Sequence, residues 1–545
     1  MKRKIRSLFL AVLMASAGVL LVSGPAQAAT ITAITTGGLW TQIASWDLNR
    51  VANSGDAVVI PSGKGIKAGG SDAYGTLTNN GTVTLKTAGT FIGGSVTNAG
   101  LIIAQGNFTN TGISNSGSIV ANGTSLNPLN FITNGAITNY STGVITVNGG
   151  VFQSTGLSNS GNFTVTNNLA TAAVTINGSV QNNSGGTINI SGGNFTTTGL
   201  NNNGGIYLSG SGYLYDKVSA ILGNGIPSAF MWQSGGIFRV DGNVQQNTSY
   251  TLSGGTLDIN NGWVVGGGSF AQSGTGSVTI DNGNFSVSAA NYTKSGTGTF
   301  TGNNGSLMIS QGRSLSGAGI FTSTGSGYTL NNSGKVTANG GTLDFSGFTG
   351  IANLSENTST NGWYATNAGK LVLPSINVTG DGTYNWGEAS GDATIDMVNS
   401  IQLAFNGVTT GGNFSISLLA ADNPDVPEVK GPDAKVAAVF DFDPPAGFAF
   451  TDVDLAFRYD DAALALLGIP EASLKIYHNE NGVWSNVTSS VDTVNKIIYA
   501  SGITSFSDFA AGSGFATPEP ATVVSGLIGL LGLAGRRLIR RKRKI

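Results

Sequence analysis

Cysteine is absent from this chain of 545 residues, and histidine occurs only once, as His478. Disulfides, thiolate metal sites and histidine-based metal clusters are therefore excluded. A lipoprotein is excluded as well, since no cysteine follows the N-terminal apolar run. The fold must be held together by packing and backbone hydrogen bonds. His478 stands beside Asn479 and Glu480, and we expect it to be an exposed residue of a turn.

Charged residues make up only 10% of the chain, and they are unevenly placed. Residues 30–390 contain 21 of them, whereas 17 of the 28 acidic residues lie at or after Asp392, which predicts a domain boundary near residue 395. Eleven of the 26 Lys and Arg residues lie in the two chain ends. The remaining 15 face 27 acidic residues, a net charge of about −12. An acidic surface argues against nucleic acid as a partner.

The first 28 residues have the composition of a secretory signal peptide. Four Lys and Arg residues within the first six positions precede an apolar run over 8–22, and Ala26-Gln27-Ala28 forms a small-x-small cleavage site. This order predicts that signal peptidase cleaves after Ala28, so that Ala29 becomes the mature N-terminus.

A second targeting pattern occupies residues 518–545. Pro518, Glu519 and Pro520 are followed by an apolar stretch over 521–535, which is near the minimum length for a helix that spans a bilayer. A cluster of cations follows, and such clusters stay on the cytoplasmic side of the membrane. Its members are Arg536, Arg537, Arg540, Arg541, Lys542, Arg543 and Lys544.

This order of motif, apolar helix and basic tail resembles the PEP-CTERM sorting signal of Gram-negative bacteria. The resemblance implies that the chain is anchored transiently in the inner membrane and is then processed by an exosortase. It also implies a final location at the cell surface or outside the cell, with exopolysaccharide and biofilm. An ordinary C-terminal membrane anchor is the alternative.

The central region repeats one frame, Gly-x-apolar-x-apolar, as in residues 81–85 (Gly-Thr-Val-Thr-Leu). Asn precedes most of the frame glycines by one to four residues. Asn and Gly both tolerate positive φ, so we expect each pair to turn the chain sharply. The frame starts, at a mean step of 20.5 residues, at Gly81, Gly100, Gly117, Gly143, Gly161, Gly186 and Gly204, and it recurs at Gly236, Gly255, Gly276 and Gly298.

Short strands at a fixed period near twenty predict a β-solenoid, in which stacked turns share one core. A series of β-sandwiches is the alternative. The region resembles the right-handed parallel β-helices of autotransporter passengers and filamentous-haemagglutinin-like proteins. We assign residues 74–394 to the solenoid and 29–73 to an N-terminal cap that covers its open edge. Trp40 and Trp46 in the cap resemble the Trp-containing first turn of secreted β-helix proteins, and carbohydrate stacking is their alternative role.

Residues 395–512 carry longer alternating strands and turn signals, which predict a small β-sandwich. The module resembles domains that secreted bacterial proteins carry ahead of a PEP-CTERM signal, with 513–517 as the linker. The expected fold class is all-β: a right-handed parallel β-helix and then a small β-sandwich, with an N-terminal signal peptide and a single C-terminal transmembrane sorting helix. The expected strands of the module are 436–442, 453–459, 474–478, 483–487 and 496–500.

Few residues of the solenoid could carry chemistry. β-Helix lyases and glycosidases place carboxylates with Arg or Lys on one face, and the candidates here are Asp241, Asp258, Asp281 and Asp344. Asp258 and Asp344 share one position of the frame, but four turns separate them by about 19 Å. We expect all four to be isolated surface residues, although loops could join Asp241 to Asp216, or Asp281 to Lys294.

Asp441 and Asp443 share one strand face, as do Asp452 and Asp454. Four oxygens from neighbouring strands could bind Ca²⁺, and a solvated acidic strand face is the simpler expectation. No catalytic residue, metal ligand or cofactor is expected.

From these patterns we expect a secreted, non-enzymatic, exosortase-processed protein of the cell surface or extracellular matrix, with a structural or adhesive role. Its expected partners are signal peptidase, the exosortase, and exopolysaccharide or neighbouring cell-surface material. The alternatives are a polysaccharide-degrading lyase or glycosidase on the β-helix, and a self-assembling sheath or fibre subunit.

Overall fold

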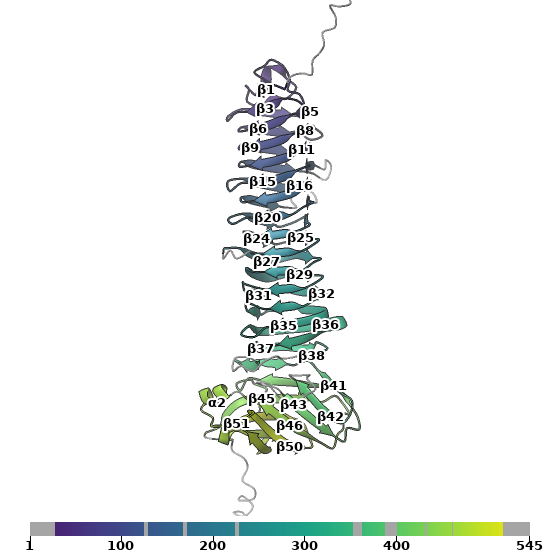
Figure 1. Cartoon of the computed structure of the whole chain (residues 1–545), viewed down its shortest axis with the longest axis vertical. Helices are drawn as coiled ribbons and strands as arrows, with labels where there is room; N and C mark the ends of the chain where they lie inside the picture. Colours follow the sequence, from purple (N-terminus) through teal and green to yellow (C-terminus); the bar gives the residue numbers. More distant parts are fainter. Residues whose placement is uncertain are drawn as a thin grey trace, which may run out of the picture. The chain divides into compact units, whose positions relative to one another are not determined.

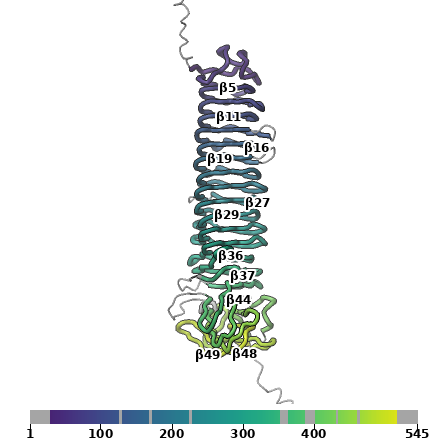
Figure 2. The backbone as a smooth tube through the Cα atoms, turned by 90° about the vertical axis from the view of Figure 1, so that its right-hand side faces the viewer, coloured from purple at the N-terminus to yellow at the C-terminus, as the bar shows by residue number. Residues whose placement is uncertain are grey.

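The computed structural model describes residues 28–124, 129–166, 172–223, 228–352, 362–386, 401–429, 431, 433–459 and 461–515. The chain divides into two compact units, unit 1 (residues 1–200) and unit 2 (residues 201–545). The described residues are all-β, with a β-solenoid of about 13 turns and almost no helix among them (Figure 1, Figure 2). The expected all-β solenoid is thus confirmed, and the right hand of its winding stays a prediction.

Strands of successive turns in unit 1 pair in parallel and form three ladders, while the 3-10 turn η1 (Ile43–Ser45) lies in the first turns. The first ladder contains β1 (Thr30–Thr32), β3 (Ala57–Ile60), β6 (Thr76–Asn79), β9 (Ser95–Asn98), β12 (Gly112–Asn115), β15 (Ala136–Asn139), β17 (Gly156–Asn159) and β20 (Val180–Asn182). The second contains β2 (Gly38–Leu39), β4 (Gly65–Ala68), β7 (Thr82–Leu85), β10 (Leu101–Ala104), β13 (Ser118–Asn122), the start of β16 (Val144–Ser154), β18 (Asn162–Val165) and β21 (Thr187–Ile190). The third contains β5 (Ser71–Tyr74), β8 (Thr90–Gly93), β11 (Asn107–Asn110), β14 (Asn130–Thr133), the end of β16, β19 (Ala172–Ile176) and β22 (Asn194–Thr197).

The repeated frame explains the second ladder. In β10, Ile102 and Ala104 are fully buried while the residues between them face outward, because side chains alternate along a strand. The glycine that opens the frame is needed for close stacking. A Cβ on Gly100 would lie 2.1 Å from the carbonyl oxygen of Gly81 in the turn before, and Gly117 stands in the same relation to Gly100.

Asparagine does not serve the turns as we expected, because none of the frame-associated asparagines of unit 1 has positive φ. The side chains of six of them lie inside the first ladder instead, whereas Asn80 is exposed. Each Nδ2 donates to the Oδ1 of the next asparagine at 2.7–2.8 Å, which forms a buried asparagine stack. The stack contains Asn79, Asn98, Asn115, Asn139, Asn159 and Asn182.

A column of phenylalanines fills the core beside the third ladder. Phe91, Phe108, Phe131 and Phe152 occupy successive turns, with centroid separations of 5.7, 4.8 and 4.7 Å. Contacts of this kind add to the area that each ring buries. Unit 1 therefore has a largely apolar interior, bordered at the first ladder by the hydrogen-bonded asparagine stack.

The solenoid of unit 2 also has three ladders of parallel strands, and several of its strands run through a corner from one ladder to the next. One ladder contains β23 (Leu200–Asn202), β26 (Ala220–Leu222), β28 (Val244–Gln246), β30 (Trp263–Val265), β33 (Phe285–Val287), the end of β35 (Phe300–Ile309), the end of β36 (Ser314–Asn332) and β38 (Gly350–Ala352). Another contains β24 (Gly205–Leu208), the start of β27 (Phe230–Val240), the start of β29 (Ser249–Ile259), β31 (Phe270–Gln272), β34 (Tyr292–Lys294), the start of β36, the start of β37 (Lys335–Gly347) and β39 (Gly362–Thr366). The third contains β25 (Tyr213–Asp216), the ends of β27 and β29, β32 (Ser277–Asp281), the start of β35, the middle of β36, the end of β37 and β40 (Lys370–Val372).

The interior of unit 2 holds glutamine, tyrosine and one lysine. Tyr250 and Tyr292 are fully buried, and their hydroxyls donate to the side-chain carbonyls of Gln233 and Gln272. Lys294 pairs with Gln272 in the ladder and donates its ammonium group to the Gly298 carbonyl. Burial lowers the pKa of Lys294 to about 8.

Two antiparallel sheets follow the solenoid within unit 2. The first joins β40 to β44 (Gly412–Leu419), β41 (Ile376–Val378), β45 (Lys435–Asp443), β51 (Asp508–Ser513), β47 (Lys475–Glu480) and β48 (Val483–Asn486). The second has the order β42 (Gly382–Trp386), β43 (Ile401–Asn406), β46 (Asp452–Arg458), β50 (Ile497–Ile503), β49 (Thr488–Asp492). Rings from the two sheets meet, with Phe440 of the first 4.5 Å from Phe457 of the second.

The strands expected over 436–500 are all present, within a few residues of the expected bounds. The Asn481-Gly482 turn is confirmed as well, with φ of 54° and 80°. The antiparallel sheets begin at Lys370, where β40 pairs with β44, and so before residue 395. The sequence patterns missed the short helix α2 (Asp461–Leu467) and the 3-10 turn η2 (Glu471–Ser473).

Candidate functional site

The sorting signal lies outside the residues that the structure describes, and so does the predicted apolar helix over 521–535. No helix within the described ranges is long and apolar enough to cross a membrane. The residues of the motif and basic cluster that lie outside are Pro518, Glu519, Pro520, Arg536, Arg537, Arg540, Arg541, Lys542, Arg543 and Lys544.

The predicted cleavage site is described from Ala28 onward, whereas Ala26 is not described. Ala29 donates its N–H to Asp56 Oδ1 at 3.3 Å, and its carbonyl accepts the N–H of Ala57 at 2.9 Å. The backbone of Ala29 is therefore bonded to the first turns of the solenoid.

Trp40 and Trp46 are buried in the first turns of unit 1, with 1% and 0% of their surface exposed. Their rings meet edge to face at 4.9 Å, and Trp46 Nε1 donates to the Trp40 carbonyl at 2.9 Å. Trp40 also contacts Phe91 at 4.6 Å. Carbohydrate stacking on these two rings is therefore wrong, because neither ring reaches solvent.

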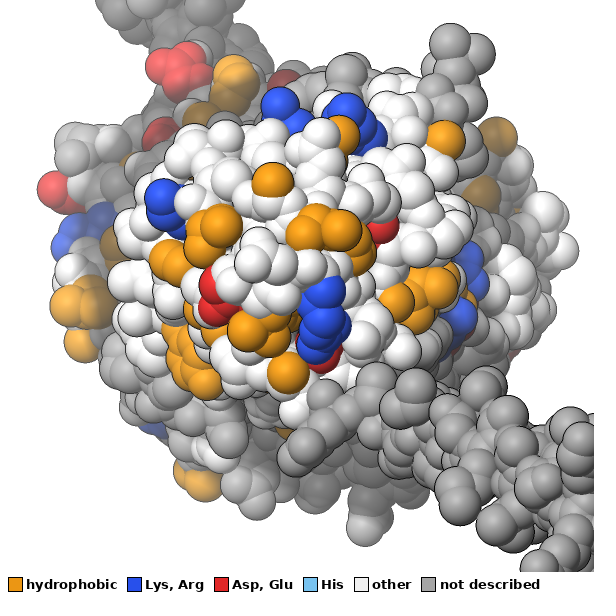
Figure 3. Space-filling view, turned by 90° about the horizontal axis from the view of Figure 1, so that it is seen from above, with side chains coloured by type: hydrophobic (Ala, Val, Ile, Leu, Met, Phe, Trp, Pro, Cys, Tyr) orange, Lys and Arg blue, Asp and Glu red, His pale blue; other side chains and the backbone are white. Residues whose placement is uncertain are grey.

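The N-terminal end of unit 1 exposes only scattered apolar side chains. Ile34, Ile43 and Leu48 are among them. Figure 3, which looks onto this end, shows the hydrophobic side chains as separate spots among polar ones. Single exposed apolar residues are ordinary in soluble domains, so this end does not define a site.

His478 is buried in β47, and the expectation of an exposed turn residue is wrong. Its ring stacks on Phe509 with centroids 4.2 Å apart, and Nδ1 lies 3.7 Å from Glu480 Oε1. Burial lowers the pKa of His478, and Glu480 opposes that effect. Packed against Phe509 within the sheet, His478 is a core residue.

The four aspartates considered for Ca²⁺ lie on two different sheets. Asp441 and Asp443 belong to β45, whereas Asp452 and Asp454 belong to β46. Asp441 Oδ2 lies 3.1 Å from the ammonium nitrogen of Lys370. Within the described ranges no group of three or more acidic or His residues is placed to hold a metal ion.

The structure joins two carboxylates that we expected to be isolated. Arg239 Nε lies 3.1 Å from Asp241 Oδ1, and Arg239 Nη1 lies 3.5 Å from Asp258 Oδ2. The three meet because Arg239 stands opposite Asp258 in the parallel pair β27–β29, and Asp241 follows two residues later on the same face. Tyr215, opposite Arg239 on β25, donates its hydroxyl to Asp241 and has its ring 5.7 Å from the guanidinium carbon.

These four residues, which we call the ionic cluster, carry more negative than positive charge. The pKa of Asp258 is raised, chiefly by burial, while Arg239 opposes this and the charges of Asp281 and Asp241 add to it. The hydrogen bond to Asp241 raises the pKa of Tyr215. Within the ionic cluster a single cation, Arg239, thus serves two carboxylates.

The other acidic candidates lie apart from the ionic cluster's ion pairs. Asp281 accepts a hydrogen bond from Asn303 at 3.3 Å, and Asp344 accepts the N–H of Ser346 at 2.8 Å. Asp241 donates its N–H to the Asp216 carbonyl at 3.0 Å, so the backbones of these two residues are adjacent, while the buried Asp216 side chain accepts the N–H of Val218 at 3.1 Å. Lys294 donates to the Gly298 carbonyl in the core, whereas Asp281 lies on an outward position of β32.

One exposed and two half-buried aromatic side chains lie on β24 and on the first half of β27. Tyr207 stands opposite Trp232 with centroids 6.0 Å apart, and Phe230 lies 5.1 Å from Tyr207. Half of the surface of Trp232 is exposed, whereas the other six tryptophans of the chain are at most 4% exposed. We call Tyr207, Phe230 and Trp232 the aromatic platform.

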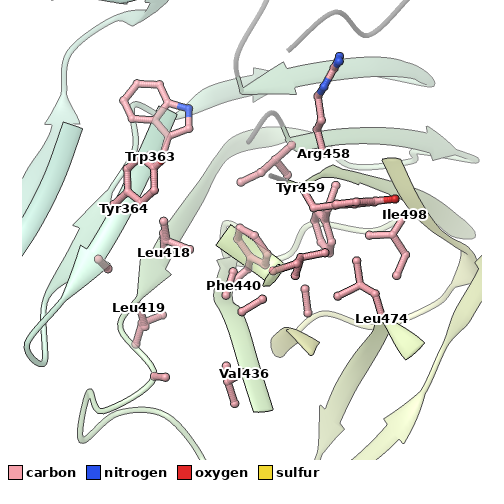
Figure 4. Close-up of a pocket in the computed structure, with 18 of the residues that line it drawn as sticks. Trp363, Tyr364, Leu418, Leu419, Val436, Phe440, Arg458, Tyr459, Leu474 and Ile498 are labelled. Atoms are coloured by element: carbon pink, nitrogen blue, oxygen red, sulfur yellow. The ribbon is translucent and has the colours of Figure 1, made fainter. Parts of the chain in front are cut away.

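An apolar cavity of about 280 Å³ lies elsewhere in unit 2, between β39 and strands of the antiparallel sheets (Figure 4). Trp363, Leu418 and Phe440 are among the residues that line it. Figure 4 shows the charged end of Arg458 directed away from these side chains. The cavity offers apolar contact and no pair of acid and base.

The sequence contained a signal for the ionic cluster that we missed. Arg239 and Asp258 each lie three residues after a frame glycine, Gly236 and Gly255. Equivalent positions in neighbouring turns stand side by side in a solenoid, so a cation and an anion one period apart should pair. We had compared the frame positions of the acidic residues only with one another, and so we missed the pair of Arg239 and Asp258.

No protein-family model matches the chain, and neither a curated protein nor a solved structure was found to be similar to it.

Proposed function

We propose that this protein is exported, processed by an exosortase and used as a structural or adhesive component of the cell surface or extracellular matrix, in contact with exopolysaccharide. The β-solenoid is the observation that carries the proposal. Its outward strand positions in unit 1 are mostly Thr, Ser and Asn, as in β7, β13 and β21. A regular array of uncharged hydrogen-bonding groups suits many weak contacts along a polysaccharide.

The direct test is co-sedimentation of the mature chain with insoluble exopolysaccharide from the producing bacterium. The proposal predicts saturable binding that survives physiological salt, because most outward groups of the solenoid are neutral. A chain that stays in the supernatant at every polysaccharide concentration contradicts it.

Export and sorting form the second part of the proposal. It is supported by Ala29, whose backbone joins the fold, and by Phe515, which stacks on Tyr477 at 4.0 Å three residues before Pro518. The folded part is thus flanked closely by both proposed processing signals. Mass spectrometry of surface material should find an N-terminus at Ala29 and a C-terminus near 517–520. Recovery of the intact basic tail from extracellular protein contradicts exosortase processing.

A polysaccharide lyase or glycosidase is the second candidate, and the ionic cluster favours it. Arg239 with Asp241 and Asp258 places a cation and two carboxylates on one face of the solenoid, as such enzymes do. A reducing-end assay with and without Ca²⁺ separates the two candidates. Sustained release of oligosaccharides that Asp258→Asn abolishes would establish the enzyme.

A further inference from the structure

The aromatic platform is a built feature of unit 2. Phe230 stands opposite Gly205 in the β24–β27 pair, and a Cβ on Gly205 would lie 2.5 Å from the Phe230 ring. The ring therefore lies over bare backbone, and this brings it against Tyr207. Tyr207 in turn lies beside Trp232. Three rings on two successive turns thus form one continuous aromatic surface.

Exposure of Trp232 is unusual for this chain. The other tryptophans serve the core, and outward positions of the solenoid are elsewhere dominated by small polar residues. Leaving a large ring half in water forgoes part of the free energy that its full burial would supply. Exposed apolar surface with a polar rim is typical of binding sites.

The ionic cluster indicates the charge of the ligand. Strand β27 carries Trp232 in its first half and Arg239 in its second, on either side of a corner at Gly236, whose φ is +68°. Over four successive turns, from β25 to β32, the outward carboxylates Asp241, Asp258 and Asp281 outnumber the cations Lys217 and Arg239. The platform's turns and the two turns after them thus present aromatic faces and an excess of negative charge. Both attract cations, since the face of an aromatic ring is electron-rich. A polyanionic ligand is disfavoured here by like charge.

We propose that the aromatic platform binds pyranose rings of a polysaccharide that carries free amino groups, and that Asp241 and Asp258 pair with its ammonium groups. The inference rests on the proposed function, and it adds the chemical class of the polysaccharide and the residues that recognise it. Ring faces stack on Tyr207 and Trp232, while the carboxylates select the protonated amine over its acetylated form.

The test uses the mature chain with two soluble probes, a hexasaccharide of β-1,4-linked glucosamine and its fully N-acetylated counterpart. Tryptophan fluorescence reports binding directly, because Trp232 is the one exposed tryptophan among the seven. We expect the glucosamine probe to protect Trp232 from acrylamide quenching and to bind at least tenfold more tightly than the acetylated probe. Added salt should weaken this binding.

Matched variants locate the site. Trp232→Ala should lower the affinity for the glucosamine probe at least tenfold, measured by calorimetry. Tyr140→Ala, which removes another half-exposed aromatic ring on a different turn, should leave it unchanged. Asp258→Asn should lower affinity for the glucosamine probe and leave the acetylated probe unaffected. Matching circular dichroism melts establish that each variant is folded.

The outcomes separate this inference from the proposed function. If wild type and Trp232→Ala bind the producer's exopolysaccharide equally, the platform is overturned while polysaccharide binding stands. Equal affinity for the two probes overturns the recognition of amines. If no polysaccharide binds at all, both the inference and the proposed binding function are wrong.

Discussion

Asn139 lies at the centre of the asparagine stack and offers the sharpest test of how unit 1 is held together. It is fully buried in β15. Its Nδ2 donates to Asn159 Oδ1 at 2.7 Å and to the Gly143 carbonyl at 3.2 Å, and its Oδ1 accepts from Asn115 Nδ2 at 2.8 Å. Every polar atom of this side chain therefore has a partner inside the solenoid.

Replacing Asn139 by Leu keeps the side chain's approximate size and removes all its hydrogen bonds. Asn159 Oδ1 then loses the donor seen here, whereas Asn115 Nδ2 keeps the Gly117 carbonyl at 3.1 Å. One orphaned buried acceptor costs about 1–3 kcal/mol. Asn139→Asp should cost more, because it turns a carboxylate oxygen toward Asn159 Oδ1 and buries a charge at a cost of several kcal/mol.

The pH dependence of Asn139→Asp provides the check on this reasoning. Burial should raise the folded-state pKa of the new carboxyl above its unfolded value of about 3.9. The protonated form can donate to Asn159, so the stability deficit should be smallest below about pH 4 and grow as pH rises through the folded-state pKa.

Urea unfolding of wild type and variants at pH 4 and pH 7, followed by circular dichroism, measures this deficit, and each 3 kcal/mol corresponds to roughly 1 M or more in midpoint. Thr138→Asp, which faces outward on the same strand, is the control and should change little. A deficit independent of pH, or an equal loss in the control, would refute the buried stack.

Three further predictions follow from the same structure. Ile145→Asp puts a charge in the dry core and should lower the free energy of unfolding by several kcal/mol in a denaturant titration. Thr146→Asp, on the opposite face of the strand, should change it by less than about 1 kcal/mol, and equal effects of the two variants would contradict the strand register. Gly117→Ala should cost at least about 2 kcal/mol in the same titration, because its Cβ would lie 2.1 Å from the Gly100 carbonyl, and an unchanged midpoint would contradict close stacking of the turns. Burial lowers the pKa of Lys294 from 10.5 to about 8, so the free energy of unfolding should rise as pH increases from 8 to 10.5. Lys294→Met should abolish this slope and raise the free energy of unfolding by about 1–3 kcal/mol at neutral pH. A slope that survives in the variant would contradict the burial of Lys294.

The solenoid could be predicted because both the glycines and the apolar residues recur with its period. Gly117 and Ile119 show both signals: the glycine permits close approach of turns, and the isoleucine fills the shared core. The asparagines carried the same period, but their side chains suit turns as well as stacks. That Asn139 bonds to the equivalent asparagines becomes visible only when neighbouring coils of the solenoid are stacked. From the sequence alone we therefore assigned it to a chain reversal.

The surface features were harder to predict because they depend on which turns are neighbours. Arg239 and Asp258 pair across one period, and Tyr207 and Trp232 meet in the same way. A search of the linear sequence for particular residue types does not show that positions one period apart are neighbours in space. His478 shows the opposite limit, because the burial of a single histidine at a strand end depends on how the antiparallel sheets pack over it.

The measurement that bears most directly on the central claim is one time course with the mature chain and exopolysaccharide from the producing bacterium. Bound protein is measured by sedimentation, and new reducing ends are measured in the supernatant. The account predicts saturable binding that Trp232→Ala weakens, with no release of oligosaccharides above the protein-free control. Steady release of oligosaccharides, lost in Asp258→Asn, would contradict it and show that the solenoid is the scaffold of an enzyme.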